Sequence, residues 1–332
     1  MLQLLFVSII LLSYCDWIEC TNLGTSWWNS NAFVALTKSN DMYAWGNSSA
    51  GGQIPAAIST SNIKSVVSTF QAFAVVRMDG TVSAWGDQSY GGGSVPTITN
   101  ADKIYANLFA FAVIKDDGTV ASWGKYVGNN GGVGVPFWLN NVVEIFTNIF
   151  EFTALKSDGT VASWGSNIAN VPSGLSNVFT IFSVQHAFAA LTYDNTIVTW
   201  GSSSGGGTQP TITEAVLTVF STLRAFAALT HTRNIVVWGD SEFGGSEVPS
   251  EATNIAIIFS TLFAFAALKR PDAGAESGGY TLIAWGKYIG NNGGSGVPSE
   301  LNNIGMVAAN EYSFAVLKID KTVVAFGRPD WG

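Results

Sequence analysis

Few residues of this chain have the types and spacing that acid–base or metal chemistry needs. Its 332 residues include two histidines, His186 and His231, at different positions of a repeat described below, so a metal-binding pair is not expected. The two cysteines, Cys15 and Cys20, lie near the start of the chain, so residues 21–332 offer no thiol ligand and no disulfide. We therefore expect no catalytic residues, no metal and no cofactor.

Two further motifs could be mistaken for reactive sites. The glycine-rich runs 128–132 and 205–207 lack the lysine and the following helix of a phosphate-binding loop. Aspartates precede glycine at Asp79, Asp117 and Asp158, where turn formation explains them. Carboxylates of distant repeats can still meet in space, so a carboxylate-dependent hydrolase is kept as a second alternative to a non-enzymatic role.

The composition limits the partners. Hydrophobic residues make up 47% of the chain and charged residues 11%, which is typical of a protein with a large buried core. The formal net charge is −8, and lysine and arginine are nowhere clustered. Nucleic acids and anionic membrane surfaces attract basic patches, so neither is an expected partner.

The start of the chain resembles a targeting segment. Leu4–Tyr14 is an apolar stretch that is too short to span a bilayer. Residues 1–20 are predicted to be a signal peptide, so residues 21–332 form the mature, secreted or extracellular protein, without stable membrane insertion after signal removal. An uncleaved anchor is the alternative.

A repeat of about 40 residues covers residues 21–332. It is marked by Trp-Gly at Trp45, Trp85, Trp123, Trp164, Trp200, Trp238 and Trp285, and by Phe326-Gly327 in an eighth copy. The third copy predicts three strands, over Lys103–Leu108, Phe111–Lys115 and Thr119–Trp123. Asp117-Gly118 suits the hairpin turn between the last two. No segment has a sustained helical period.

Short antiparallel strands at this spacing predict an all-β fold with very little helix. We expect a single β-propeller of eight mostly three-stranded blades, with seven blades as the alternative. The glycine-rich loops 124–136 and 286–298 nearly match, as do residues 86–92 and 239–245. These matches indicate that a four-blade unit is duplicated.

One aromatic position is the same in every copy, which predicts a packing role between blades. It is occupied by Phe33, Phe73, Phe111, Phe152, Phe188, Phe226, Phe265 and Phe314. The repeated tryptophans are expected to pack beside these rings.

The motif Asp-Gly-Thr-Val followed by Trp-Gly, at Asp79–Val82 with Trp85-Gly86 and at Asp117–Val120 with Trp123-Gly124, resembles the regulator-of-chromosome-condensation repeat superfamily. The short three-stranded repeat is most similar to the beta-lactamase inhibitor protein II type, over about residues 31–327. The resemblance implies a propeller with a protein-binding role. The tract before the second strand departs from the family's frequent Gly-x-x-His, since it has Asn107–Ala110 and Thr222–Ala225 at this place.

The first and second strands of each repeat, A and B, meet in a turn that should lie beside the glycine-rich loop after strand C. Two residues before each repeated phenylalanine the copies differ: Asn31, Gln71, Phe109, Phe150, His186, Arg224, Phe263 and Tyr312. The loop aromatics Tyr90, Tyr126, Phe243 and Tyr288 should stand near them. Aromatic and arginine side chains dominate binding hot spots, so these twelve residues are the predicted partner-binding site. The resemblance implies partner contact for Phe109, Phe150, Phe263 and Tyr312.

The predicted function is that of a secreted binding scaffold with a protein partner, including inhibition of an extracellular enzyme. A carbohydrate-binding, lectin-like propeller with a glycan ligand is the alternative, because aromatic rings and amides also suit sugars. Packing of the same side chains among themselves is the structural alternative for the predicted site.

Overall fold

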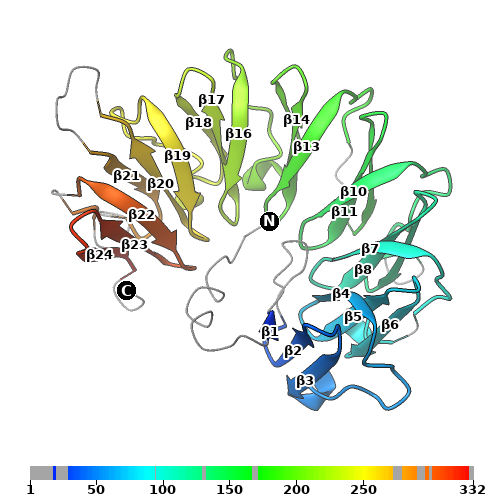
Figure 1. Ribbon diagram of the computed structural model, residues 1–332. Helices are drawn as coiled ribbons and strands as arrows, with labels where there is room; N and C mark the ends of the chain where they lie inside the picture. The colour runs from blue at the N-terminus through cyan, green and yellow to red at the C-terminus, as the bar shows by residue number, and fades with distance from the viewer. Residues whose placement is uncertain are drawn as a thin grey trace. The chain divides into compact units, whose positions relative to one another are not determined.

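The computed structural model describes residues 18–19, 29–93, 95–128, 132–166, 171–271, 279–289, 296–298 and 301–328. These residues form eight three-stranded antiparallel sheets, each with its strands in sequence order, so that strand B lies between strands A and C (Figure 1). No α-helix occurs in the described residues. The eight sheets confirm the predicted all-β fold of eight three-stranded repeats with very little helix.

The chain divides into two compact units between Val178 and Phe179, at the start of the fifth repeat. The first unit holds the sheets β1 (Ile18–Glu19), β2 (Ala32–Thr37) and β3 (Met42–Gly46); β4 (Ile63–Ser68), β5 (Ala72–Arg77) and β6 (Val82–Gly86); β7 (Ala101–Ala106), β8 (Ala110–Lys115) and β9 (Val120–Gly124); and β10 (Val142–Thr147), β11 (Glu151–Lys156) and β12 (Val161–Gly165).

The second unit holds the remaining four repeats. Its strands are β13 (Val178–Ser183), β14 (Ala187–Thr192) and β15 (Ile197–Gly201); β16 (Val216–Ser221), β17 (Ala225–Thr230) and β18 (Ile235–Gly239); β19 (Ile255–Ser260), β20 (Ala264–Lys269) and β21 (Thr281–Gly286); and β22 (Ile304–Ala309), β23 (Ser313–Lys318) and β24 (Val323–Gly327). In the described residues of both units, a 3-10 helix follows strand C in four repeats: η1 (Ser48–Ala50), η2 (Gln88–Tyr90), η3 (Ser203–Gly205) and η4 (Ser241–Phe243).

The third sheet shows how well the strand pattern predicts the elements. Strands B and C begin within one residue of their predicted starts. Strand A, expected over Lys103–Leu108, instead spans Ala101–Ala106, with a β-bulge between Ala101 and Lys103. Asn107, which follows, belongs to the turn.

The repeated aromatics pack in pairs within each blade. Phe111 lies directly opposite Trp123 in the register of β8 and β9, and their rings stack with centroids 5.3 Å apart. Each hydrophobic core cluster then joins two consecutive blades of one unit; one such cluster includes Val67 and Ala74 of the second blade with Ile104 and Phe111 of the third. The predicted packing role is confirmed for seven of the eight phenylalanines, which are at most 5% exposed.

The first copy is the exception. Phe33 is 58% exposed and its stacking partner Trp45 is 50% exposed, so the expectation of a buried Phe and Trp in every copy was wrong here. In the other copies of the first unit, this pair packs on a loop of the preceding repeat.

The predicted signal peptide, residues 1–20, lies outside the described residues except for Ile18 and Glu19. These two residues form β1 and pair with Thr37 and Leu36 of β2. The signal peptide and the domain boundary after residue 20 stay predictions. In the part of the chain that the structure describes, no helix has the length and apolarity to cross a bilayer.

Candidate functional site

A buried polar side chain holds the turn between strands A and B. Asn107 is 1% exposed, and its Oδ1 accepts hydrogen bonds from the main-chain N–H groups of Phe109 (2.9 Å) and Ala110 (2.8 Å). Asn148 does the same for Phe150, and the Thr261 hydroxyl does so for Phe263. These hydrogen bonds from the side chain to the main chain, called here the turn cap, fix the backbone at the variable residue and at the residue after it. The variable side chain therefore projects from a fixed turn.

The loop after Trp-Gly begins beside this turn in every blade. The N–H of Lys125 donates to the carbonyl of Phe109 across 3.1 Å, and the same bond joins the turn and loop of the other seven repeats. The predicted turns and loops therefore share one end of each sheet, called here the turn-and-loop end. The B–C turns lie at the other end of strand B.

Four predicted residues of the first unit come together at this end. In this first aromatic cluster (Tyr90, Phe109, Tyr126 and Phe150), Phe109 stacks on Tyr90 and on Phe150 with centroids 5.4 Å apart in both cases. Tyr126 meets Phe109 edge-on at 5.1 Å and Phe150 at 5.8 Å. Side chains from the second, third and fourth blades thus form one contact set.

The second unit repeats this arrangement. In the second aromatic cluster (Phe243, Phe263, Tyr288 and Tyr312), Phe263 stacks on Phe243 at 5.3 Å and on Tyr312 at 5.2 Å. Tyr288 meets Phe263 edge-on at 5.3 Å and Tyr312 at 6.1 Å. Each ring corresponds by its place in the repeat to a ring of the first cluster.

Cations lie over the rings, and they differ between the clusters. In the first cluster the ammonium of Lys125 is 4.8 Å from the Tyr126 centroid. In the second cluster three cations lie within 6.0 Å of a ring centroid: Arg224, Lys287 and Arg328. Such contacts favour a fixed ring geometry and leave positive charge at the surface.

Acidic side chains accompany these cations. Glu242 accepts a hydrogen bond from Lys287 at 2.8 Å, which lowers the pKa of this carboxyl and raises the pKa of Lys287. Asp240 lies 3.8 Å from the Arg224 guanidinium, while its Oδ1 accepts a hydrogen bond from the N–H of Glu242. Arg224 Nε also donates to Gln185 Oε1 at 2.7 Å, which orients the guanidinium.

Most cluster residues are half-buried, which is intermediate between a core and a free surface. Phe243 differs, since it is 8% exposed and belongs to the core between the sixth and seventh blades. Phe243 therefore supports its neighbours, and the exposed parts of the other rings are what a partner could reach.

The other predicted site residues lie at the same turn position but outside these ring contacts. Asn31 is exposed, and its amide donates to the Ser30 hydroxyl. Gln71 is half-buried beside the first cluster, and its carbonyl accepts from Asp87. Burial lowers the pKa of His186, and the nearby Arg224 guanidinium lowers it further.

Sequence reasoning missed four members of this site: Phe70, Lys125, Lys287 and Arg328. Phe70 packs on Tyr90 at 5.9 Å and directly precedes a predicted residue. Lys125 and Lys287 each precede a predicted tyrosine in the duplicated loop, so the duplication was a usable signal for them.

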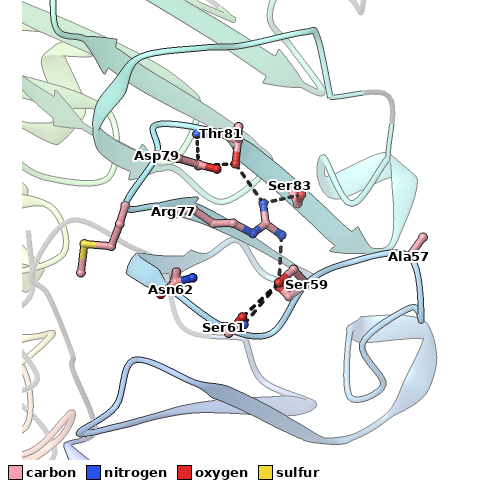
Figure 2. Close-up of a pocket in the computed structure, with 9 residues that line it drawn as sticks. Ala57, Ser59, Ser61, Asn62, Arg77, Asp79, Thr81 and Ser83 are labelled. Carbon is pink, nitrogen blue, oxygen red and sulfur yellow. Dashed lines mark hydrogen bonds between the residues drawn. The ribbon is translucent and has the colours of Figure 1, made fainter.

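A separate pocket of about 440 Å³ opens at the B–C end of the second blade (Figure 2). Figure 2 shows the Arg77 guanidinium among hydroxyl groups: it donates to Ser83 Oγ at 3.0 Å and to the Ser59 carbonyl at 3.1 Å. Asp79 accepts from the N–H and hydroxyl of Thr81. These bonds tie the blade to the preceding connection, so the arginine there has a structural role.

Several carboxyl groups of the described residues have lowered pKa values. A general acid needs a raised carboxyl pKa, whereas the pKa of Glu242 at the turn-and-loop end is lowered. At the B–C turns, hydrogen bonds from Thr119 and Thr160 lower the pKa of Asp117 and bring that of Asp158 to about 2. Within the described ranges, no group of three or more His, Cys, Asp or Glu side chains could hold a metal.

No family model and no curated protein match the chain. Among solved structures, the ectodomain of the Physcomitrella patens receptor kinase CR4 is 17% identical with a TM-score of 0.45, over 80% of this chain and 73% of that one. The CRINKLY WD40 ectodomain of the Arabidopsis thaliana receptor kinase ACR4 is 15% identical with a TM-score of 0.43, over 77% and 90%.

Prp20p from Saccharomyces cerevisiae, the yeast RCC1, is 16% identical with a TM-score of 0.42, over 64% of this chain and 71% of that one. These identities and scores assign neither a family nor a function. The blade architecture described above follows from the eight sheets themselves.

Proposed function

We propose that the chain is a secreted, non-catalytic binding protein that contacts a protein partner through the turn-and-loop end of its blades. The main support is the aromatic cluster that is built once in each unit from corresponding residues. Apart from the buried Phe243, its rings are half-buried, and cations lie beside them; aromatic and arginine side chains are typical of interface hot spots. Secretion follows from the predicted signal peptide.

The ring geometry favours a protein over a glycan. A sugar stacks on a free aromatic face, but Tyr90 and Phe150 of the neighbouring blades already cover the Phe109 ring. Phe263 is covered in the same way by Phe243 and Tyr312. The partly exposed rings and the cations beside them remain, and protein side chains can pack against both.

Inhibition of an extracellular enzyme is the specific form of this function that we infer from the resemblance to the inhibitor type. In that type, aromatics at the matching turn positions contact the partner. Phe109, Phe150, Phe263 and Tyr312 are the corresponding residues here, and each belongs to one of the clusters.

Affinity capture from the native extracellular fluid tests the proposal. The triple variant Phe109→Ala/Phe150→Ala/Phe263→Ala should lose the proteins that the wild type retains. The matched control is Met78→Ala/Tyr193→Ala, which removes exposed side chains at the B–C end and should retain them. Equal retention by the wild type and the triple variant would remove this site assignment, and a signal from glycans alone on an array would favour the lectin.

A further inference from the structure

The two aromatic clusters have the same shape but not the same charge. By their places in the repeat, Tyr90, Phe109, Tyr126 and Phe150 correspond to Phe243, Phe263, Tyr288 and Tyr312, and Lys125 corresponds to Lys287. Further positions differ in charge, among them Gln71, Ser89 and Ser166 in the first unit, which are Arg224, Glu242 and Arg328 in the second. The two units thus have corresponding aromatic clusters with different charged side chains beside them.

Arg224 is the clearest of these differences. Its guanidinium carbon lies 5.3 Å from the Phe243 ring centroid, and Nε is held by Gln185. The distance to Asp240 is 3.8 Å, which is longer than a hydrogen bond, and the side chain is 41% exposed. A guanidinium that is oriented by one nitrogen can present its terminal N–H groups to a carboxylate from outside.

We propose that Arg224 gives the second aromatic cluster a preference for an acidic side chain of a protein partner, next to an apolar side chain that packs on the ring edges. The first cluster, with Gln71 at this position, takes an apolar segment without that preference. This inference rests on the proposed function, because it names the partner chemistry at the same end of the blades.

The net charge of the chain determines which rate of binding Arg224 should affect. At −8 the protein does not attract an acidic partner over long distances, so the preference must arise from the short-range contact with Arg224. Loss of Arg224 should therefore increase the dissociation rate of an acidic peptide and leave its association rate nearly unchanged.

The probe is a phage-displayed library of short random peptides, followed by kinetics on synthetic copies of the retained peptides. Three proteins are compared: the wild type, Arg224→Gln, and Gln71→Arg, each variant carrying the residue of the corresponding position in the other unit. We expect the wild-type protein to retain peptides that combine Asp or Glu with an apolar residue. Arg224→Gln should bind these peptides with about tenfold lower affinity. Gln71→Arg should increase the share of acidic peptides.

Two outcomes would overturn this inference alone: retained peptides without acidic enrichment, or equal binding of acidic peptides to the wild type and Arg224→Gln. A fourth protein, Phe109→Ala/Phe263→Ala, separates the two proposals. If retained peptides bind this variant as well as the wild type, or if no peptide is retained, the proposed function itself fails. Thermal melts of all four proteins show whether each remains folded, and Gln71→Arg tests the preference by a gain that unfolding cannot mimic.

Discussion

The indole N–H of Trp123 donates a hydrogen bond to the main-chain carbonyl of Gly91 across 3.1 Å. This bond joins the third blade to the loop of the blade before it. The same bond links Trp85 to Gly51, Trp238 to Gly206 and Trp285 to Gly244. Neighbouring blades are therefore joined by a directional contact as well as by apolar packing.

Trp123→Phe should keep the stacking on Phe111 and lose this hydrogen bond. The buried Gly91 carbonyl then has no indole donor, and the free energy of unfolding should fall by about 1–3 kcal/mol. The eighth copy naturally carries Phe326 at this position, so the ring itself is compatible with the fold. Urea denaturation gives the measurement.

Trp45→Phe is the matched control for that variant, since Trp45 is 50% exposed. Its effect should stay within about 0.5 kcal/mol. Similar losses for Trp45→Phe and Trp123→Phe would contradict a stabilising role for the bond between blades.

Gly91→Ala should be destabilising for two reasons. Gly91 has φ +86°, which an alanine adopts only with strain, and a Cβ there would lie 2.8 Å from the Phe111 ring. Gly174 has a similar φ of +79° but open space around a Cβ. Gly174→Ala should therefore cost roughly 1–2 kcal/mol, and Gly91→Ala roughly 1–3 kcal/mol more, as measured by urea denaturation.

The difference between these two variants isolates the contact with Phe111, because the backbone strain is common to both. Equal stability of Gly91→Ala and Gly174→Ala would mean that the loop moves away from Phe111 without a cost in free energy.

Phe137→Ser/Trp138→Glu should leave the fold unchanged and reduce self-association. Phe137 is 100% exposed and Trp138 is 53% exposed, between Pro136 and Leu139 in a turn closed by a main-chain hydrogen bond. The corresponding positions of the duplicated loop carry serine and glutamate. Unfolding free energy should change by less than about 0.5 kcal/mol.

Sedimentation velocity at rising concentration measures the second effect, because exposed aromatic pairs promote association. A large loss of stability in this variant would show that the pair packs within the fold.

The stability should fall on acidification through His186. Burial and Arg224 lower its pKa in the folded chain, so below the ordinary value of 6.5 the unfolded chain takes up a proton more readily than the folded one. The contribution of neutral His186 to the free energy of unfolding is fully present above pH 6.5, and it is lost as the pH falls through the lowered pKa of the folded chain. Asparagine is the residue at the corresponding position of the first copy, Asn31. His186→Asn should therefore show a smaller fall of the free energy of unfolding between about pH 8 and about pH 5, as measured by urea denaturation.

His231→Asn, at an exposed B–C turn, is the control for the loss of a histidine elsewhere. A pH dependence that is identical in the wild type and His186→Asn would contradict the role given to burial at this turn.

The amino-acid sequence by itself determined the blades and the end at which the variable side chains lie. The reason is that both depend on local features: the Asp117-Gly118 turn, the opposing Phe111 and Trp123, and the turn cap at Asn107 act within one repeat. The start of β7 was missed by two residues, because a bulge leaves no mark in the alternation of side chains.

Only the tertiary structure decided which of the predicted residues meet. Tyr90, Phe109 and Phe150 belong to three blades, and their stacking depends on the direction in which each turn points its side chain. The exposure of Phe33 likewise depends on how neighbouring blades pack within a unit. The contact of Arg224 with Phe243 joins the turn and the loop of one repeat, and it depends on the direction in which each of them points its side chain. Spacing along the chain carries no information about such contacts, because they join surfaces that local structure alone does not bring together.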